Sequence, residues 1–317
     1  MQRSIPFIRV SDATAAFDLY ERRGALLMKI RIISSIVALM ILVPIVIFSG
    51  TVVLPVAVAI VSVLAVFEML RCCNVHKRLL FALPYYFAAV LVPTYLYLSV
   101  KLESGVPISA ALLLLMFFFV IWTYPVAIFS KGKMPVTDAA TASIGCIYII
   151  AGLNAILYTR QIMPEGIYLF ALVFIGAWIT DSAAYFCGRA FGKHKLIPDV
   201  SPKKTVEGSI GGILFCVLFF AIYALIVEKW IAGGSVAANY PALLISAFFI
   251  SIVSQIGDLA MSLLKRHYNI KDFGKIMPGH GGVLDRFDSV LAVSVVLLIC
   301  SLISSGLFGA DLFAPVV

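Results

Sequence analysis

Acidic residues stand inside or at the ends of long apolar stretches at five positions: Glu68, Asp181, Asp258, Asp285 and Asp288. A charged side chain is costly inside a lipid bilayer, so acids at such positions need partners and mark function by default. Each acid taken alone can simply pair with a neighbouring lysine or arginine. Taken together, acids from such distant parts of the chain predict a shared polar cavity.

Spacing places several polar groups on common helix faces. One face carries groups at i, i+4, i+7 and i+8: Asp258, Ser262, Lys265 and Arg266. Asp285 and Asp288 stand at i and i+3, so both carboxylates can point the same way. They repel each other unless a cation lies between them, and hard oxygen ligands favour Mg²⁺ or Ca²⁺ over Zn²⁺. The plainer alternative is a pair of helix-start aspartates stabilised by the helix dipole.

The loop before Asp285 is rich in glycine and follows a run of basic residues. It contains Pro278, Gly279, His280, Gly281 and Gly282. These residues let the backbone turn sharply and expose amide N–H groups to an anion. The cations ahead of the loop are Lys265, Arg266, Lys271 and Lys275. Phosphate-binding cations beside metal-binding acids indicate phosphoryl or nucleotidyl transfer.

At this level of detail the stretch from Ser262 to Asp288 resembles the defining motif of the phosphatidate cytidylyltransferases, also called CDP-diacylglycerol synthases. The matching positions are Ser262, Lys265, Arg266, Lys271, Asp272, Pro278, His280, Gly281, Gly282, Asp285, Arg286 and Asp288. Met277 departs mildly from the pattern, since Leu, Ile or Phe is more usual there. A second block, from Asp181 to Gly212 with the turn SPKKT, is similar to the other polar region of the same family.

The resemblance implies that CTP and phosphatidate react to give CDP-diacylglycerol and pyrophosphate, with Mg²⁺ required. It assigns the metal centre and catalysis to Asp258, Asp285 and Asp288, with Lys265 and Arg266 as further catalytic residues. It implies substrate contacts at a larger set: Lys203, Lys204, Ser262, His280, Gly281, Gly282, Arg286 and Arg189. It also suggests a homodimer, which the residues themselves do not demonstrate.

Some roles stay open at this point. His280 either contacts a phosphate or base, or only holds its loop. Ser262 either reaches a metal or phosphate, or packs as an ordinary small residue. Asp181 and Glu68 are candidates for orienting basic groups instead of binding metal.

The elements that must position these residues are membrane helices. Apolar residues make up 62% of the 317, charged residues 13%, and the mean hydropathy is +1.07. A span needs about 20 mainly apolar residues. Nine stretches qualify: 32–49, 51–70, 79–100, 108–129, 137–158, 167–187, 209–227, 242–264 and 287–308. We therefore expect an all-α polytopic membrane protein with about nine spans, and the sixth and eighth helices extending past the membrane at their polar ends.

Basic residues orient this bundle. With the N-terminus in the cytoplasm, all but Lys101, Arg160 and Lys229 of the 24 lysines and arginines fall on the cytoplasmic side, as the positive-inside rule requires. The C-terminus is then outside. The acids lie near the cytoplasmic face, and a bacterial inner membrane is the expected location. Phosphatidate would be drawn from the cytoplasmic leaflet, and the net charge of +8 is assigned to lipid and phosphate, with no nucleic acid.

Residues 1–27 are the least membrane-like part and are expected to form a surface helix or a disordered extension. Residues 28–317 are expected to form a single catalytic membrane domain. The six cysteines are scattered in apolar runs and are interpreted as small buried hydrophobic residues.

Rival functions are a CTP-dependent kinase of a polyprenol lipid and a cytidylyltransferase for an ether-linked lipid. A transporter or channel is a rival from a different class, because acids in a helix bundle also suit ion passage. The charges gather at one face and no convincing inverted repeat relates the two halves, which argues against transport.

Overall fold

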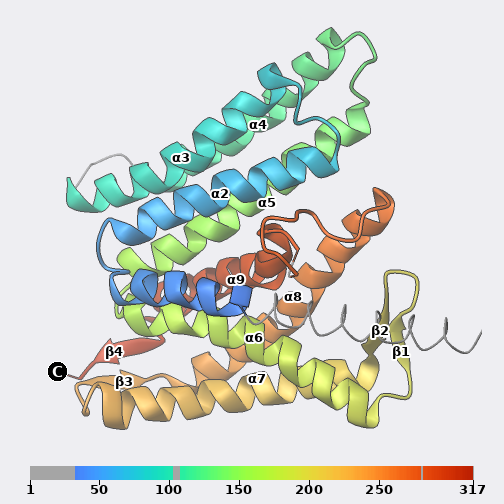
Figure 1. Cartoon of the computed structure of the whole chain (residues 1–317). Helices are drawn as coiled ribbons and strands as arrows, with labels where there is room; N and C mark the ends of the chain where they lie inside the picture. The colour runs from blue at the N-terminus through green and yellow to red at the C-terminus, as the bar shows by residue number, and fades with distance from the viewer. Residues whose placement is uncertain (1–32, 103–107, 280, 317) are drawn as a thin grey trace, which may run out of the picture.

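Long apolar helices build the protein, for which the computed structural model describes residues 33–102, 108–279 and 281–316. A first helix at Ile33–Ile47 is followed by eight labelled helices (Figure 1): α2 (Val53–Cys72), α3 (Leu79–Lys101), α4 (Ile108–Phe129), α5 (Val136–Gln161), α6 (Gly166–Phe191), α7 (Val206–Ile226), α8 (Tyr240–His267) and α9 (Leu284–Phe308). A short π-helix, Val227–Ile231, continues α7.

Two short antiparallel strand pairs lie outside the long helices. Strand β1 (Lys195–Ile197) pairs with β2 (Ser201–Thr205), and β3 (Val236–Ala238) pairs with β4 (Phe313–Pro315). The expected all-α class therefore holds for the membrane helices, and the segments outside them add one hairpin (β1–β2) and one pair of strands distant in sequence (β3–β4). These segments pair because their backbone groups have no helical partners.

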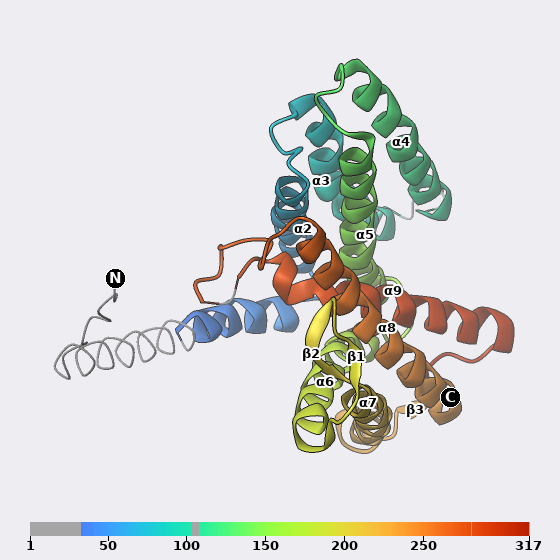
Figure 2. The same ribbon diagram turned by 90° about the vertical axis from the view of Figure 1, so that its right-hand side faces the viewer.

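Helix α9 occupies the centre of the bundle. It packs against α8, α5 and α6 and touches α2, and Figure 2 shows it between the α2–α5 group and the α6–α7 pair. Its inward residues, such as Leu291 and Val293, are fully buried. Whatever stands at the start of α9 therefore lies where several helices meet.

Successive helices alternate in direction, so that the connecting segments gather at two ends (Figure 1). At one end the loop after α2 touches the loop after α4, where Arg78 donates to the carbonyl of Lys133 at 3.2 Å. The β1–β2 hairpin and the end of α8 lie at this end as well. At the other end Arg160 donates to Ser49 at 2.8 Å, and β3–β4 closes that side.

Seven of the described helices are long and apolar enough to cross a membrane: α2, α3, α5, α6, α7 with its π-helical extension, α8 and α9. The other two predicted spans are also helical, but their described apolar helices, Ile33–Ile47 and Leu114–Phe129, are shorter. Helices α6 and α8 run on to Phe191 and His267, past the predicted ends of their spans. The count of nine and the orientation of the bundle stay predictions, and residues 1–27 lie outside the described part.

Glycine allows α6 and α7 to pack with their backbones in contact. A Cβ atom at Gly208 would lie 2.5 Å from the carbonyl oxygen of Ala184 and 3.1 Å from the Cα of Gly188. Both neighbours are backbone atoms that cannot turn aside as a side chain would. This close packing sets the direction in which the β1–β2 hairpin, which joins these two helices, leaves the bundle.

We predict that Gly208→Ala pushes α6 and α7 apart and lowers the free energy of unfolding by about 1–3 kcal/mol. The matched control is Gly306→Ala in α9, where an added Cβ meets no atom of the described residues within 4 Å. Thermal unfolding of the detergent-solubilised proteins measures both. Equal unfolding temperatures for the two variants would contradict the close packing.

Candidate functional site

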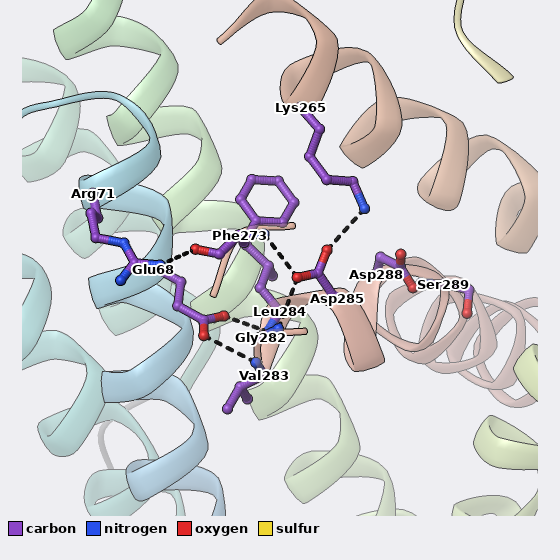
Figure 3. A network of polar contacts seen from close by, with 10 residues as sticks. All are labelled: Glu68, Arg71, Lys265, Phe273, Gly282, Val283, Leu284, Asp285, Asp288 and Ser289. Carbon is purple, nitrogen blue, oxygen red and sulfur yellow. Dashed lines mark hydrogen bonds and ion pairs between the residues drawn. The ribbon is translucent and has the colours of Figure 1, made fainter. Parts of the chain in front are cut away.

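Asp285 holds together three separate parts of the polar end. Its Oδ1 accepts from Lys265 of α8 at 2.9 Å, and its Oδ2 accepts from the backbone N–H groups of Phe273 at 2.8 Å and Gly282 at 3.0 Å. The carboxylate is almost fully buried, and Figure 3 shows it between Lys265 and the loop. The Lys265 ammonium also lies 5.4 Å from the centre of the Phe273 ring. Asp285 therefore links α8 and α9 to the segment 268–283 that connects them, the glycine loop.

Glu68 reaches the same loop from α2. It is fully buried, and its two oxygens accept from the backbone N–H groups of Val283 at 3.1 Å and Leu284 at 2.8 Å. Both contacts are to amides at the start of α9, and Glu68 also interacts electrostatically with Arg71 of the same helix. The expectation that Glu68 orients a basic side chain stays a prediction.

A second group of acids lies on the other side of Asp285. Asp288 is one turn further along α9 and interacts electrostatically with Asp258 of α8 and Asp181 of α6. Asp258 forms an ion pair with Lys204 of β2 at 2.6 Å, and Asp181 accepts from the hydroxyl of Ser289 at 2.9 Å. Three helices and the hairpin thus converge at one level, as the sequence predicted.

Close packing of α8 on α9 brings these acids together. A Cβ atom at Gly257 would lie 2.8 Å from Cβ of Ala292 and 3.2 Å from the carbonyl oxygen of Asp288. The hydroxyl of Tyr148 on α5 is 3.3 Å from the same point and is buried without a hydrogen-bond partner among the described residues. A buried hydroxyl that lacks a partner beside Asp288 is a candidate donor to a bound group at this place.

The donor chemistry fits a hard divalent cation. Asp181, Asp258 and Asp288 offer carboxylate oxygens, which suit Mg²⁺. Within the described residues no three acidic, histidine or cysteine side chains already stand in a metal-binding arrangement. Lys204 supplies the positive charge beside Asp258. Asp285 differs from the other two predicted metal ligands, because three donors already engage its oxygens, and a metal role for it stays a prediction.

The β1–β2 hairpin presents the SPKKT turn. Glu207, at the start of α7, accepts from the backbone N–H groups of Lys193 and His194 and contacts the His194 ring at 2.6 Å. Thr205 caps α7 by accepting from the N–H of Gly208 at 3.1 Å. These bonds tie the base of the hairpin to α7. Lys203 projects from it and is exposed, with no ion-pair partner in the described part of the chain.

The glycine loop is folded back on itself and lines a pocket. Met277 and Gly281 exchange backbone hydrogen bonds at 2.9 and 3.1 Å, and Gly279 and Gly281 have positive φ values of 76° and 92°. The pocket has a volume of about 400 Å³ and is lined by Lys271, Asp272, Gly274, Lys275, Met277, Pro278, Gly279, Gly281 and Arg286. Cations and tightly turned glycines therefore share one concave surface, which suits a phosphate group.

The remaining predicted residues divide between this surface and its surroundings. Arg266 is exposed and lines a pocket with Asn269, Ile270 and Lys271. Arg189 is exposed at the end of α6. Ser262 is partly buried on α8 and has no hydrogen-bond partner among the described residues. Gly282 donates to Asp285, and His280 lies outside the described residues.

Sequence reasoning assigned no part to Tyr148, Arg71 or Ser289. Tyr148 stands in an apolar helix among aliphatic residues, and nothing local marks it. Arg71 donates to the carbonyl of Phe273 from the last turn of α2, where it counted only as a cytoplasmic charge. Glu207 did have a signal, since it follows the SPKKT turn and matches the family pattern.

We predict that Asp285→Asn lowers the free energy of unfolding by about 3 kcal/mol, because it leaves the buried Lys265 ammonium without its counter-ion. Thermal unfolding in detergent measures this loss. The double variant Asp285→Asn with Lys265→Met removes both charges and is expected to recover part of the stability. An unfolding temperature for Asp285→Asn equal to that of the unsubstituted protein would show that the contacts of Asp285 do not stabilise the fold.

Comparisons with known proteins identify the family of this chain. A family model described as the cytidylyltransferase family matches residues 29–303. A protein from Staphylococcus haemolyticus named phosphatidate cytidylyltransferase is 35% identical over 272 residues, which cover 85% of this chain and 97% of that protein. Proteins of the same name from Staphylococcus epidermidis and Staphylococcus aureus are 32% and 34% identical with the same coverage. The chain therefore belongs to the cytidylyltransferase family.

Proposed function

We propose that this protein is a phosphatidate cytidylyltransferase, which transfers CMP from CTP to phosphatidate and releases pyrophosphate. The observation that carries the proposal is the grouping of Asp181, Asp258 and Asp288 in a bundle of membrane-length helices. Lys204 of the SPKKT hairpin pairs with Asp258, and Asp285, one turn before Asp288, bonds to the glycine loop. The names of the Staphylococcus relatives support the choice of phosphatidate.

The reaction joins two polyanions that repel each other, and cationic residues of the site offset this repulsion. An oxygen of the phosphatidate phosphate attacks the α-phosphorus of CTP, a new P–O bond forms, and the bond to the β-phosphate breaks. Negative charge accumulates on the departing pyrophosphate, where fixed cations stabilise it. Phosphatidate already carries an ionised oxygen, so the chain need not supply a strong base.

Mg²⁺ is proposed as the cofactor, held by Asp258 and Asp288 with Asp181 beside them. When bound, such a cation neutralises phosphate charge and polarises the phosphorus centre. Asp285 and Lys265 position the glycine loop, while the exposed cations Lys203, Arg189 and Arg266 are proposed to hold phosphate oxygens. The Tyr148 hydroxyl is available to hydrogen-bond to a group placed among the acids.

Membrane placement follows the same reasoning. The polar end is proposed to face the cytoplasm of a bacterial cell, because it carries most of the lysines and arginines. Phosphatidate would enter sideways from the cytoplasmic leaflet with its acyl chains left in lipid. Residues 28–317 are proposed to act as one catalytic domain, and a homodimer is proposed on the family resemblance.

We predict that labelled CTP distinguishes this reaction from lipid phosphorylation. With the label in the α-phosphate, radioactivity passes to phosphatidate in the presence of Mg²⁺, whereas a label in the γ-phosphate passes to pyrophosphate. Asp288→Asn is expected to lower the rate at least about 100-fold. The control is Asp199→Asn, an exposed acid of the hairpin, which should leave the rate unchanged. Transfer of the γ-label to a lipid would identify a kinase and overturn the proposal.

We predict that Lys203→Ala raises the KM for CTP about 10-fold, because one charge-assisted contact to phosphate is lost. The matched control is Lys131→Ala, an exposed lysine in the loop between α4 and α5 at the same end of the bundle. Added salt should reduce the difference in KM for CTP between Lys203→Ala and the unsubstituted protein, because salt screens exposed charges. An equal KM in both variants would exclude Lys203 from the nucleotide site.

A further inference from the structure

The last turn of α2 lies against the glycine loop, although about 200 residues of sequence separate the two. Glu68 accepts hydrogen bonds from the N–H groups of Val283 and Leu284. Arg71, one turn later, donates to the carbonyl of Phe273 at 2.5 Å. Figure 3 shows both side chains reaching from α2 toward the loop and the start of α9. The loop is therefore held at both of its ends by a helix outside the motif.

Helix α9 depends on Glu68 for its first turn. The residue at its N-cap position is Val283, which has no polar side chain, and no side-chain cap bond is formed. Val283 and Leu284 are buried, so water cannot satisfy their N–H groups. The Glu68 carboxylate satisfies both and places a negative charge at the positive end of the helix dipole.

The loop backbone is shaped around this carboxylate. A Cβ atom at Gly282 would lie 2.5 Å from both Glu68 oxygens, and one at Gly274 would overlap its Oε1. Any larger residue at these positions would therefore displace Glu68 or the loop. Among the described residues Glu68 forms no ion pair, and its charge is compensated by the amides of Val283 and Leu284 together with the nearby positive charge of Arg71.

Two buried carboxylates divide the amides of the loop between them. Asp285 accepts hydrogen bonds from the N–H groups of Phe273 and Gly282. Glu68 accepts them from the N–H groups of Val283 and Leu284. Together they fix where α9 begins and how its first turn is rotated. Asp288 is one turn further along the same helix and faces Asp258 and Asp181. A rotation of the first turn of α9 would move Asp288 relative to both acids.

We infer that Glu68 is a positioning residue of the active site, which acts through the loop and the first turn of α9 to set Asp288 and the phosphate-binding amides. Its two oxygens accept from backbone N–H groups of the protein, so we assign it no direct contact with substrate or metal. The inference rests on the proposed function for its effect on the reaction, and on the geometry alone for its effect on the loop.

The test compares Glu68→Gln with Ser62→Ala. Ser62 lies on the same helix, is fully buried, and has no hydrogen-bond partner among the described residues. In Glu68→Gln one amide oxygen remains, and the new NH₂ group faces an N–H that has lost its acceptor. Hydrogen exchange of the peptides covering 273–286 is expected to become about 10-fold faster in this variant and to stay unchanged in Ser62→Ala.

Kinetics separate positioning from simple loss of folded protein. For Glu68→Gln we expect kcat/KM for CTP to fall about 10-fold or more, with an unchanged KM for phosphatidate. A merely structural role would lower the amount of active protein and leave both KM values unchanged. Direct binding of CTP without lipid is expected to weaken in parallel. Arg71→Gln, an exposed substitution that removes the other tether, should show a smaller loss of the same kind even if Glu68→Gln folds poorly.

Each result decides one point. Unchanged exchange in Glu68→Gln would overturn the capping role, and normal kcat/KM with faster exchange would overturn the positioning role. If the unsubstituted protein transfers no CMP to phosphatidate, the proposed function is wrong, and exchange together with CTP binding still decides whether Glu68 positions the loop.

Discussion

A buried carboxylate must find donors, and this requirement organises the polar end of the protein. Asp285 and Glu68 are both buried where water cannot reach them, and a charge left without partners there would cost several kcal/mol. Each is satisfied by backbone amides of one loop, and Asp285 also by Lys265. The glycine loop, α8, α9 and α2 are joined because the two acids accept from different amides of one continuous segment.

The five acids fall into two groups by their contacts in the structure. The oxygens of Asp285 and Glu68 accept hydrogen bonds from the protein. Asp181, Asp258 and Asp288 face one another and have fewer donors. Repulsion among the latter three favours a cation between them. Asp285 and Asp288 stand one turn apart on α9, so the contacts that fix Asp285 also help to position Asp288. A site that must bind a triphosphate and a lipid phosphate gains from such preorganised acids and amides.

Glycine residues allow the close backbone contacts found around these buried charges. At Gly274 and Gly282 it lets the loop backbone touch Glu68, and at Gly257 it lets α8 approach α9 beside Asp288. At Gly208 it brings α7 against α6, which fixes the base of the hairpin that carries Lys203 and Lys204. Close backbone contact at these places holds each functional group to one position, because rigid backbone atoms cannot adjust as long side chains do.

The sequence alone determined the membrane character, the helix positions, the family and the grouping of the acids at one end. Apolar length, basic asymmetry and a motif of many fixed positions are local properties, so they can be read without coordinates. Which acid bonds to which donor was decided only by tertiary structure. Nothing in the sequence around Glu68 names Val283 or Leu284 as its partners, and Asp285 and Asp288 look alike at i and i+3. Their different roles arise because one faces the loop and the other faces α6 and α8, a difference that depends on how the helices pack.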